Sequence, residues 1–250
     1  MKIAVCIKRV PDTETRVRVA SDGASADEAG VKFIISPFDE FAIEEALQRR
    51  EKAGAGEVVV VALGPEAAQE TIRTAMAMGV DRGILLKADA VPADALAVAK
   101  ALAAELRGGG YDLILFGKAA ADDNSQAVGP MVAELLELPC VTSVVKLDME
   151  GANGTAQREI EGGVEVVRFA LPAVLTADKG LNAPRYPSLK GIMAAKKKPI
   201  EVKPVTLEAS RLRVVRLEQP PSRKEGRIVG EGPDAAAELV RLLREEARVI

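Results

Sequence analysis

The 250-residue chain contains no histidine, no tryptophan and only two cysteines, Cys6 and Cys140. The absence of histidine excludes Ser–His and Cys–His nucleophile pairs, imidazole acid–base catalysis and His-ligated zinc. Two cysteines are too few for a four-cysteine metal site, and they do not suggest a disulfide framework in a chain of this length. We therefore expect no metal site and no catalytic residue, in a protein of a reducing compartment.

Aromatic residues make up 3% of the chain although apolar residues reach 48%, so the core has to be built from Val, Leu, Ile and Ala. The formal net charge is −3, with acids and bases mixed along the chain, which argues against a nucleic-acid partner. No apolar run approaches the roughly 18–20 residues of a membrane span. We expect no secretory signal, because Met1-Lys2 leads straight into a strand-like segment. We expect a soluble, cytoplasmic protein of one or two domains without membrane insertion.

The first 140 residues alternate short apolar runs with amphipathic segments. Near-continuous Val, Ile and Leu is typical of strands buried on both faces of a parallel sheet, and such runs cover residues 3–7, 57–63, 83–86 and 112–116. Strand–helix alternation with short connections predicts a right-handed, doubly wound, mainly parallel α/β sheet of the Rossmann-like kind.

Helix signals lie between these runs. In Ser36-Pro37-Phe38-Asp39 the serine is an N-cap candidate, the proline suits the first helical position and the acid suits the third. That helix is expected to end near Ala53, before Gly54. Further helices are expected near residues 66–78, 93–106 and 126–137.

After Pro139 the pattern changes. Strand-like runs at 141–149, 155–160 and 164–171 are separated by Asn153-Gly154 and Gly162-Gly163, which predict hairpin turns because these residues tolerate positive φ. The sequence predicts an antiparallel meander over about 141–178, beside the α/β sheet.

The C-terminal part of the chain is rich in proline. Residues 182–233 hold seven of the 14 prolines, which predicts an extended arm with little regular structure. A final amphipathic helix is expected from about Asp234 to Ala247. We therefore divide the chain into residues 1–181, an α/β domain with the meander, and residues 182–250, the arm.

One short segment of the arm carries an apolar face. Pro184 and Pro187 suppress regular structure just before Leu189, Ile192 and Met193, which lie on one face of about one helical turn. A single turn is not stable alone in water, so the segment has to pack on something else. Two interpretations stay open: a strap over its own domain, or a hook that offers a leucine to a partner.

Ligands of a doubly wound sheet bind beyond the carboxyl ends of its strands. The loops at 8–12, 63–65 and 117–126 meet this condition. In the third loop, Gly117 permits close backbone approach, and Asn124 or Ser125 can cap the next helix while its free N–H groups face a phosphate. Neither a Walker loop nor a GxGxxG fingerprint is present. A nucleotide-binding loop and an ordinary capped loop both remain possible interpretations.

Asp122 and Asp123 would repel a phosphate. We expect them to bind ribose hydroxyls, to act as caps or to form salt bridges with Lys8 or Arg9. Adjacent residues on an extended backbone point to opposite sides, which argues against the two carboxylates converging on one ion and so against a catalytic or metal-binding role. Cys6 lies inside a buried strand and is expected to pack rather than to react.

Three segments together resemble the β subunit of electron transfer flavoprotein over essentially the full length of the chain. Residues 156–176 resemble the family's signature, with an acid-glycine turn, Glu165 and Pro172 in matching places. Residues 181–193, Leu-Asn-Ala-Pro-Arg-Tyr-Pro-Ser-Leu-Lys-Gly-Ile-Met, resemble its recognition loop, and residues 117–130 resemble its nucleotide loop. The combination is highly specific.

The resemblance implies an electron carrier rather than a bond-making enzyme. The family works as an αβ heterodimer that accepts electrons from dehydrogenases, often acyl-CoA dehydrogenases, and passes them toward the respiratory chain through a quinone oxidoreductase. The α subunit holds most of the FAD, and the β subunit shields part of the flavin and binds AMP as a structural ligand. Residues 1–181 would then be a nucleotide-binding domain, and residues 182–250 would pack on the α subunit.

Carried over by position, the resemblance implies three sets of residues. Glu159 would bias the orientation of the flavin domain. Leu189 would anchor the chain in a dehydrogenase pocket, flanked by Arg185, Tyr186, Ile192 and Met193. The AMP contacts would be Cys6, Ser36, Pro37, Phe38, Asp39, Leu63, Gly117, Lys118, Ala119, Ala120, Ala121, Asp122, Asp123, Asn124, Ser125, Gln126, Ala127 and Val128.

The chain departs from the family pattern in two places. Ser125-Gln126-Ala127 stands where Thr-Ala-Gln is common, and Thr13 stands where some relatives carry an aromatic residue near the flavin. Some family members bifurcate electrons and hold a second FAD in place of AMP. A free-standing ATP-binding α/β module is also compatible with the first 140 residues, and a nucleotidyl-transfer or hydrolase enzyme could use Asp122 and Asp123.

Overall fold

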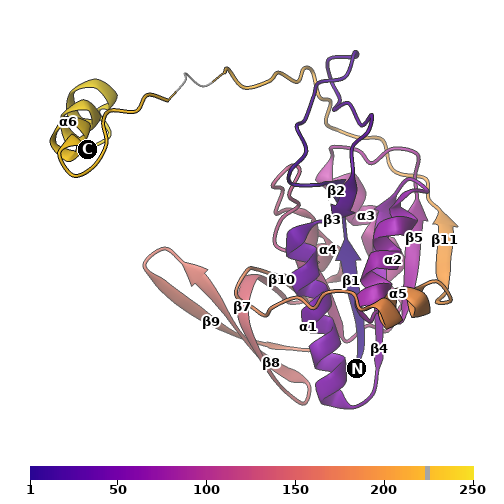
Figure 1. Ribbon diagram of the computed structural model, residues 1–250. Coiled ribbons are helices and arrows are strands. Elements are labelled where there is room, and N and C mark those ends of the chain that lie inside the picture. The colour runs from indigo at the N-terminus through magenta and orange to yellow at the C-terminus, as the bar shows by residue number, and fades with distance from the viewer. Residues whose placement is uncertain (223–225) are drawn as a thin grey trace.

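The computed structural model describes residues 1–222 and 226–250. Its centre is a nine-stranded sheet in the order β11-β5-β4-β1-β6-β10-β7-β8-β9 (Figure 1). Neighbouring strands from β11 to β7 run parallel, whereas β7, β8 and β9 pair antiparallel. The predicted fold class is confirmed. The strands are β1 (Lys2–Ile7), β4 (Glu57–Gly64), β5 (Arg82–Lys87), β6 (Leu113–Gly117), β7 (Cys140–Glu150), β8 (Asn153–Ile160), β9 (Gly163–Ala170), β10 (Ala173–Ala177) and β11 (Ile200–Pro204).

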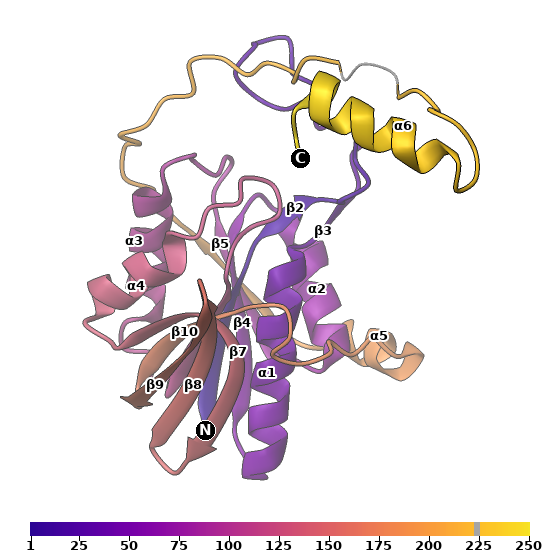
Figure 2. The same cartoon turned by 90° about the vertical axis from the view of Figure 1, so that its left-hand side faces the viewer.

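Helices cover both faces of the parallel part of this sheet (Figure 2). Alternate residues of β1 point to opposite faces: Ile3 and Val5 pack with α1 and α2, while Ala4 and Cys6 pack with α3 and α4. Each face therefore has its own aliphatic core, as a doubly wound sheet requires. The helices are α1 (Pro37–Ala53), α2 (Ala68–Met78), α3 (Ala95–Leu106) and α4 (Val128–Leu136).

The bounds of α1 match the prediction, because a proline at the first helical position and a glycine after the last one are strong local signals. Gly54 has a φ of 68° and donates its N–H to the carbonyl of Glu51. Ser36 occupies the predicted N-cap position, but its hydroxyl makes no cap bond and instead donates to the carbonyl of Ala119 at 3.4 Å.

The meander is confirmed, but its turns lie two residues and one residue earlier than predicted. Glu150 pairs with Asn153, so the first turn is Gly151-Ala152, with Gly151 at a φ of 60°. Ile160 pairs with Gly163, which leaves Glu161-Gly162 as the second turn. The meander also continues the main sheet rather than standing beside it, because β10 runs parallel between β6 and β7. The separation of β10 from the strand before it was not predicted from the sequence.

The arm combines extended backbone with short elements. It contains α5 (Leu189–Ala195) and β11, which pairs with β5 at one edge of the sheet. Its middle includes residues 223–225, which lie outside the described residues. The predicted last helix is present as α6 (Ala235–Leu242) and a following helical turn, η1 (Leu243–Ala247). Figure 1 shows it apart from the sheet, and none of its residues is buried.

A small second sheet pairs β2 (Arg9–Pro11) with β3 (Phe33–Ile35) in antiparallel fashion and holds the loop 12–32 above the carboxyl end of β1. Within residues 1–222 and 226–250, no helix is long and apolar enough to cross a bilayer.

Candidate functional site

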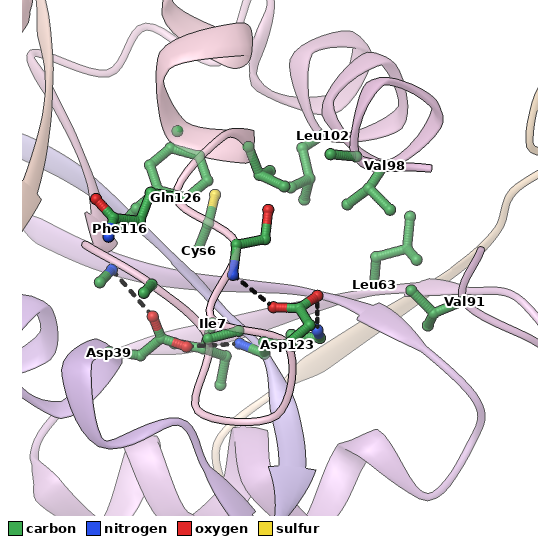
Figure 3. A pocket seen from close by; sticks show the side chains of 18 of the residues that line it. Cys6, Ile7, Asp39, Leu63, Val91, Val98, Leu102, Phe116, Asp123 and Gln126 are labelled. Atoms are coloured by element: carbon green, nitrogen blue, oxygen red, sulfur yellow. Dashed lines mark hydrogen bonds and ion pairs between the residues drawn. The ribbon is translucent and has the colours of Figure 1, made fainter. Parts of the chain in front are cut away.

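A pocket opens at the carboxyl ends of β1, β4 and β6, where a doubly wound sheet is expected to bind its ligand (Figure 3). One wall is the loop after β6 with the start of α4, and the other is the segment 91–95 with α3. The lining residues are Cys6, Ile7, Lys8, Asp39, Leu63, Val91, Pro92, Ala93, Ala95, Val98, Leu102, Phe116, Gly117, Lys118, Ala119, Ala120, Asp123, Ser125, Gln126, Val128 and Gly129.

Asp39, in the first turn of α1, connects the ends of two strands at this pocket. Its buried carboxylate accepts the N–H of Lys8 at 2.7 Å and the N–H of Gly117 at 2.9 Å. Burial raises the pKa of Asp39 to about 7, while the two N–H donors and the Lys8 ammonium act to lower it. The start of α1, the end of β1 and the end of β6 are thus held together by one side chain.

Gly117 is required by this arrangement. A Cβ at that position would lie 2.5 Å from Asp39 Oδ1 and 2.6 Å from the carbonyl carbon of Phe38. The structure thus shows a close backbone approach at Gly117, made by the N-terminus of α1; the approach of a ligand to this loop stays a prediction.

Lys8 and the acid pair form a compact cluster. The Lys8 ammonium lies 2.8 Å from Asp122 and 2.9 Å from Asp123. Burial lowers the pKa of Lys8, but its bonds to the two carboxylates outweigh this effect and raise that pKa above its usual value. The predicted salt bridge to Lys8 is confirmed. Arg9, the other candidate partner, lies over the Phe33 ring, with 3.3 Å from its Cζ to the ring centroid.

The prediction that the two carboxylates point apart is wrong, because the backbone is not extended there. Residues 121–123 form a turn, and Asn124 follows with a φ of 53°. The turn places both acids on the same side of the loop, where one ammonium faces two carboxylates and the cluster keeps an excess of negative charge.

The predicted helix cap at Asn124 or Ser125 is also wrong. α4 begins later, at Val128 after Ala127, and no side chain caps it. The N–H of Asn124 donates to the carbonyl of Ala120, so it belongs to the turn. The first N–H groups of a helix have no acceptor within the helix. Since Val128 and Gly129 line the pocket, these N–H groups and the helix dipole favour an anionic group there.

The second basic residue of the loop is also paired. The Lys118 ammonium lies 2.8 Å from Asp178 and 5.0 Å from the centroid of the Phe38 ring. Lys8 and Lys118 are thus both engaged with carboxylates. The polar wall of the pocket therefore offers an anion the N–H groups at the start of α4 and the neutral side chains of Ser125 and Gln126, which suits a ligand with one anionic group.

The opposite wall is apolar. Leu63, Val91, Val98 and Leu102 lie together on it (Figure 3). Cys6 also lines the pocket, and burial raises the pKa of its thiol far above the usual value, so it packs as an apolar residue, as predicted. An apolar wall opposite backbone donors fits a flat aromatic ring that carries an anionic substituent.

Part of this apolar wall was not predicted from the sequence. Residues 91–95 follow the carboxyl end of β5, so the rule that selected the other three loops could have selected this one. Its sequence signals, Pro92 and the α3 N-cap Asp94, are typical of any helix start and do not indicate a ligand.

The predicted nucleotide contacts divide into two groups. Most line the pocket: Cys6, Asp39, Leu63, Gly117, Lys118, Ala119, Ala120, Asp123, Ser125, Gln126 and Val128. The others, Ser36, Pro37, Phe38, Ala121, Asp122, Asn124 and Ala127, lie outside the lining. Among these, Ser36 and Phe38 support the loop through Ala119 and Lys118, and Asp122 holds Lys8.

The segment with the predicted apolar face is both strapped down and exposed. α5 packs against α2, yet Leu189 is 79% exposed and Tyr186 is 94% exposed. Ile192 and Met193 are also exposed. The strap and the outward-facing leucine, which the sequence left as separate interpretations, therefore occur together.

Two further candidate residues lie away from the pocket. Arg185 is held in ion pairs with Glu44 and Glu51. Glu159 is exposed on β8, next to the turn that leads to β9, and pairs in register with Val164.

Fold and pocket define the class: a doubly wound α/β protein with a pocket at the carboxyl ends of its parallel strands. Comparison with known proteins gives the family. The model of the electron transfer flavoprotein domain matches residues 24–208. The chain is 45% identical to electron transfer flavoprotein subunit beta of Bradyrhizobium diazoefficiens and 41% identical to that of Bacillus subtilis, with 100% of both chains covered. It is 43% identical to the human subunit beta, with 96% of both chains covered. The chain therefore belongs to the electron transfer flavoprotein family, as a member of its β-subunit group.

Proposed function

We propose that the chain is the β subunit of a heterodimeric electron transfer flavoprotein and binds AMP in the pocket at the carboxyl ends of β1, β4 and β6. The observation that carries the proposal is the composition of this pocket, in a chain that matches β subunits over its whole length. The apolar wall around Leu63 and Val98 suits the adenine ring. The N–H groups at the start of α4 suit one phosphate.

AMP would have a structural role in this site. The pocket lies where β1, β6, α1 and α4 meet, so a ligand there would contact all of these elements. The excess negative charge of the Lys8, Asp122 and Asp123 cluster favours a monophosphate over nucleotides with longer phosphate chains. The same cluster supports a non-catalytic role for the acids, because Lys8 already engages both carboxylates.

The redox group in this proposal is an FAD held mainly by the α subunit and shielded in part by this chain. Residues 182–250, with the exposed α6, would pack on the α subunit, and residues 1–181 would form the nucleotide-binding domain. Glu159 on the meander would bias the orientation of the flavin domain. The β subunit would contribute binding and shielding and no bond-making chemistry of its own.

Electrons would come from dehydrogenases, in particular of the acyl-CoA type, and would leave toward the respiratory chain through a quinone oxidoreductase. Leu189 would dock in an apolar pocket of the dehydrogenase, with Tyr186, Ile192 and Met193 around it. Their exposure in the free chain supports this role, because a contiguous set of exposed apolar side chains marks an interaction site.

Acid extraction of the purified heterodimer, followed by chromatography, tests the nucleotide assignment. We expect one AMP and one FAD per heterodimer. Two FAD and no AMP would contradict the assignment and indicate an electron-bifurcating member of the family. Bound ATP that the protein hydrolyses would favour a free-standing nucleotide module or a hydrolase instead.

A further inference from the structure

Residues 182–198, here called the docking segment, are fixed to α1 and α2 at both ends. At its start, the Asn182 side chain donates to the carbonyl of Phe41 at 3.0 Å and to Glu45 Oε2 at 3.1 Å. At its end, Arg73 of α2 donates to the carbonyls of Ala195 at 2.6 Å and Lys198 at 2.5 Å. The segment therefore has a defined path across the two helices.

Glu44 of α1 holds the part that directly precedes Leu189. Its carboxylate accepts the backbone N–H of Arg185 at 3.2 Å and the guanidinium N–H groups at 2.8 and 3.0 Å. The side chain of Glu44 is only 5% exposed. Burial acts to raise the pKa of Glu44, but the hydrogen bonds from Arg185 and Gln48 together outweigh it and lower that pKa, so the carboxylate is charged at neutral pH. A buried, charge-assisted contact of this kind fixes geometry strongly.

Glu51, further along α1, binds the same guanidinium from the solvent side. Its oxygens lie 2.6 and 3.0 Å from the Arg185 nitrogens, and its side chain is 48% exposed. Exposed ion pairs contribute little to stability. Glu51 therefore provides a control with the same partner and the same charge but little burial.

Gly191 fixes the distance between α5 and α2. A Cβ at Gly191 would lie 2.3 Å from the backbone carbonyl oxygen of Ala77, so no larger residue fits while α5 keeps its place. In contrast, the apolar side chains of the same helix point outward, with Leu189 79% and Met193 57% exposed. The anchors thus hold the backbone of the docking segment and leave its apolar side chains free.

We propose that Glu44 and Gly191 are positioning residues for dehydrogenase docking, which hold α5 so that Leu189 is presented in its bound geometry before the partner arrives. The inference rests on the proposed function. Holding a loop in its bound conformation increases affinity, because the cost of ordering it does not fall on binding. If removing an anchor leaves α5 in place about one tenth of the time, the apparent affinity falls about tenfold.

The test uses the complete heterodimer with FAD as electron acceptor for an acyl-CoA dehydrogenase and its acyl-CoA substrate. The variants are Glu44→Gln, Gly191→Ala, Glu51→Gln as matched control, and Leu189→Ala as docking control. We expect Glu44→Gln and Gly191→Ala to raise the KM for the flavoprotein about tenfold at unchanged kcat, and Glu51→Gln to raise it less than about threefold. Hydrogen exchange of residues 185–198 in the free heterodimer should accelerate in the first two variants.

The outcomes separate the inference from the proposed function. If Leu189→Ala raises KM while Glu44→Gln and Gly191→Ala leave both KM and hydrogen exchange unchanged, the docking role of Leu189 is supported and the positioning role of Glu44 and Gly191 is refuted. If Leu189→Ala has no effect on KM, the docking role of the segment fails, and the inference fails with it. Should Glu44→Gln prevent folding, Gly191→Ala alone decides, since it changes no charge.

Discussion

Gly117→Ala tests the junction of α1, β1 and β6 beside the pocket. The new Cβ would lie 2.5 Å from Asp39 Oδ1, 2.6 Å from the carbonyl carbon of Phe38 and 2.7 Å from the Asp39 nitrogen. Two of these atoms belong to the backbone of the first turn of α1, so they cannot move without moving the start of the helix. Gly117 has no positive φ in this structure, so the substitution acts through space rather than through backbone strain.

Two effects determine how far Gly117→Ala lowers the free energy of unfolding. Overpacking in a closely packed region costs about 1–3 kcal/mol. Weakening the bond between the Gly117 N–H and the Asp39 carboxyl group, now 2.9 Å, adds about 1–2 kcal/mol, because the acceptor is buried. We therefore expect the free energy of unfolding to fall by about 2–5 kcal/mol, which lowers the Tm by roughly 4–20 °C for a chain of this size.

Urea and thermal unfolding of Gly117→Ala would be compared with Gly163→Ala. A Cβ at Gly163 would meet nothing within 4 Å, and its φ also lies outside the left-handed region, so the control should stay within about 0.5 kcal/mol of the unaltered chain. Equal stability of Gly117→Ala and Gly163→Ala would refute the close packing of α1 against the end of β6 through Gly117 and Asp39.

Individual side chains give three more predictions. The folded-state pKa of Asp39 is raised to about 7 from 3.8, so the folded protein keeps a proton that the unfolded chain releases. The free energy of unfolding should therefore fall as pH rises, by about 2–3 kcal/mol between about pH 5 and pH 7. An Asp39→Asn variant with the same pH dependence of stability would contradict this. Leu189→Ala should weaken dehydrogenase binding roughly 30- to 150-fold, because about 2–3 kcal/mol of side-chain burial in the complex is lost. The Tm of the free protein should stay constant, because the Leu189 side chain is 79% exposed. A lower Tm with normal binding would show that Leu189 has a purely structural role. The Cys6→Ala, Cys140→Ala double variant of the heterodimer should still be reduced by its dehydrogenase. The pKa values of both thiols are raised, so neither cysteine forms the reactive thiolate readily. A double variant that keeps its fold and flavin but is no longer reduced would contradict this.

Local signals predicted the elements that local chemistry determines. α1 begins at Pro37 and ends before Gly54. Proline lacks an N–H and suits the first helical position, and glycine readily adopts the left-handed backbone that ends a helix, so both positions are specified without help from other residues. The hairpin turn predicted at Asn153-Gly154 is wrong for the opposite reason. The pairing of Glu150 with Asn153 sets the register of the hairpin and places the turn at Gly151-Ala152.

Elements fixed by distant contacts could not be predicted. β10 is buried in full between β6 and β7, and β11 joins the edge of the sheet beside β5, a pairing that depends on contacts more than a hundred residues apart. The loops of the pocket could be predicted, since they follow from the strand ends. The convergence of Asp122 and Asp123 on Lys8 could not, because it depends on a turn that no glycine or proline marks.

A visible absorption spectrum shows whether this chain forms one half of a flavin-carrying electron transfer heterodimer. The chain would be co-expressed with the α subunit and purified, and the spectrum would be recorded before and after addition of an acyl-CoA dehydrogenase with its substrate. We expect flavin absorption that appears only with both subunits present and is bleached when the dehydrogenase delivers electrons. A colourless chain that does not associate with the α subunit, or a flavin that the dehydrogenase cannot reduce, would contradict the claim.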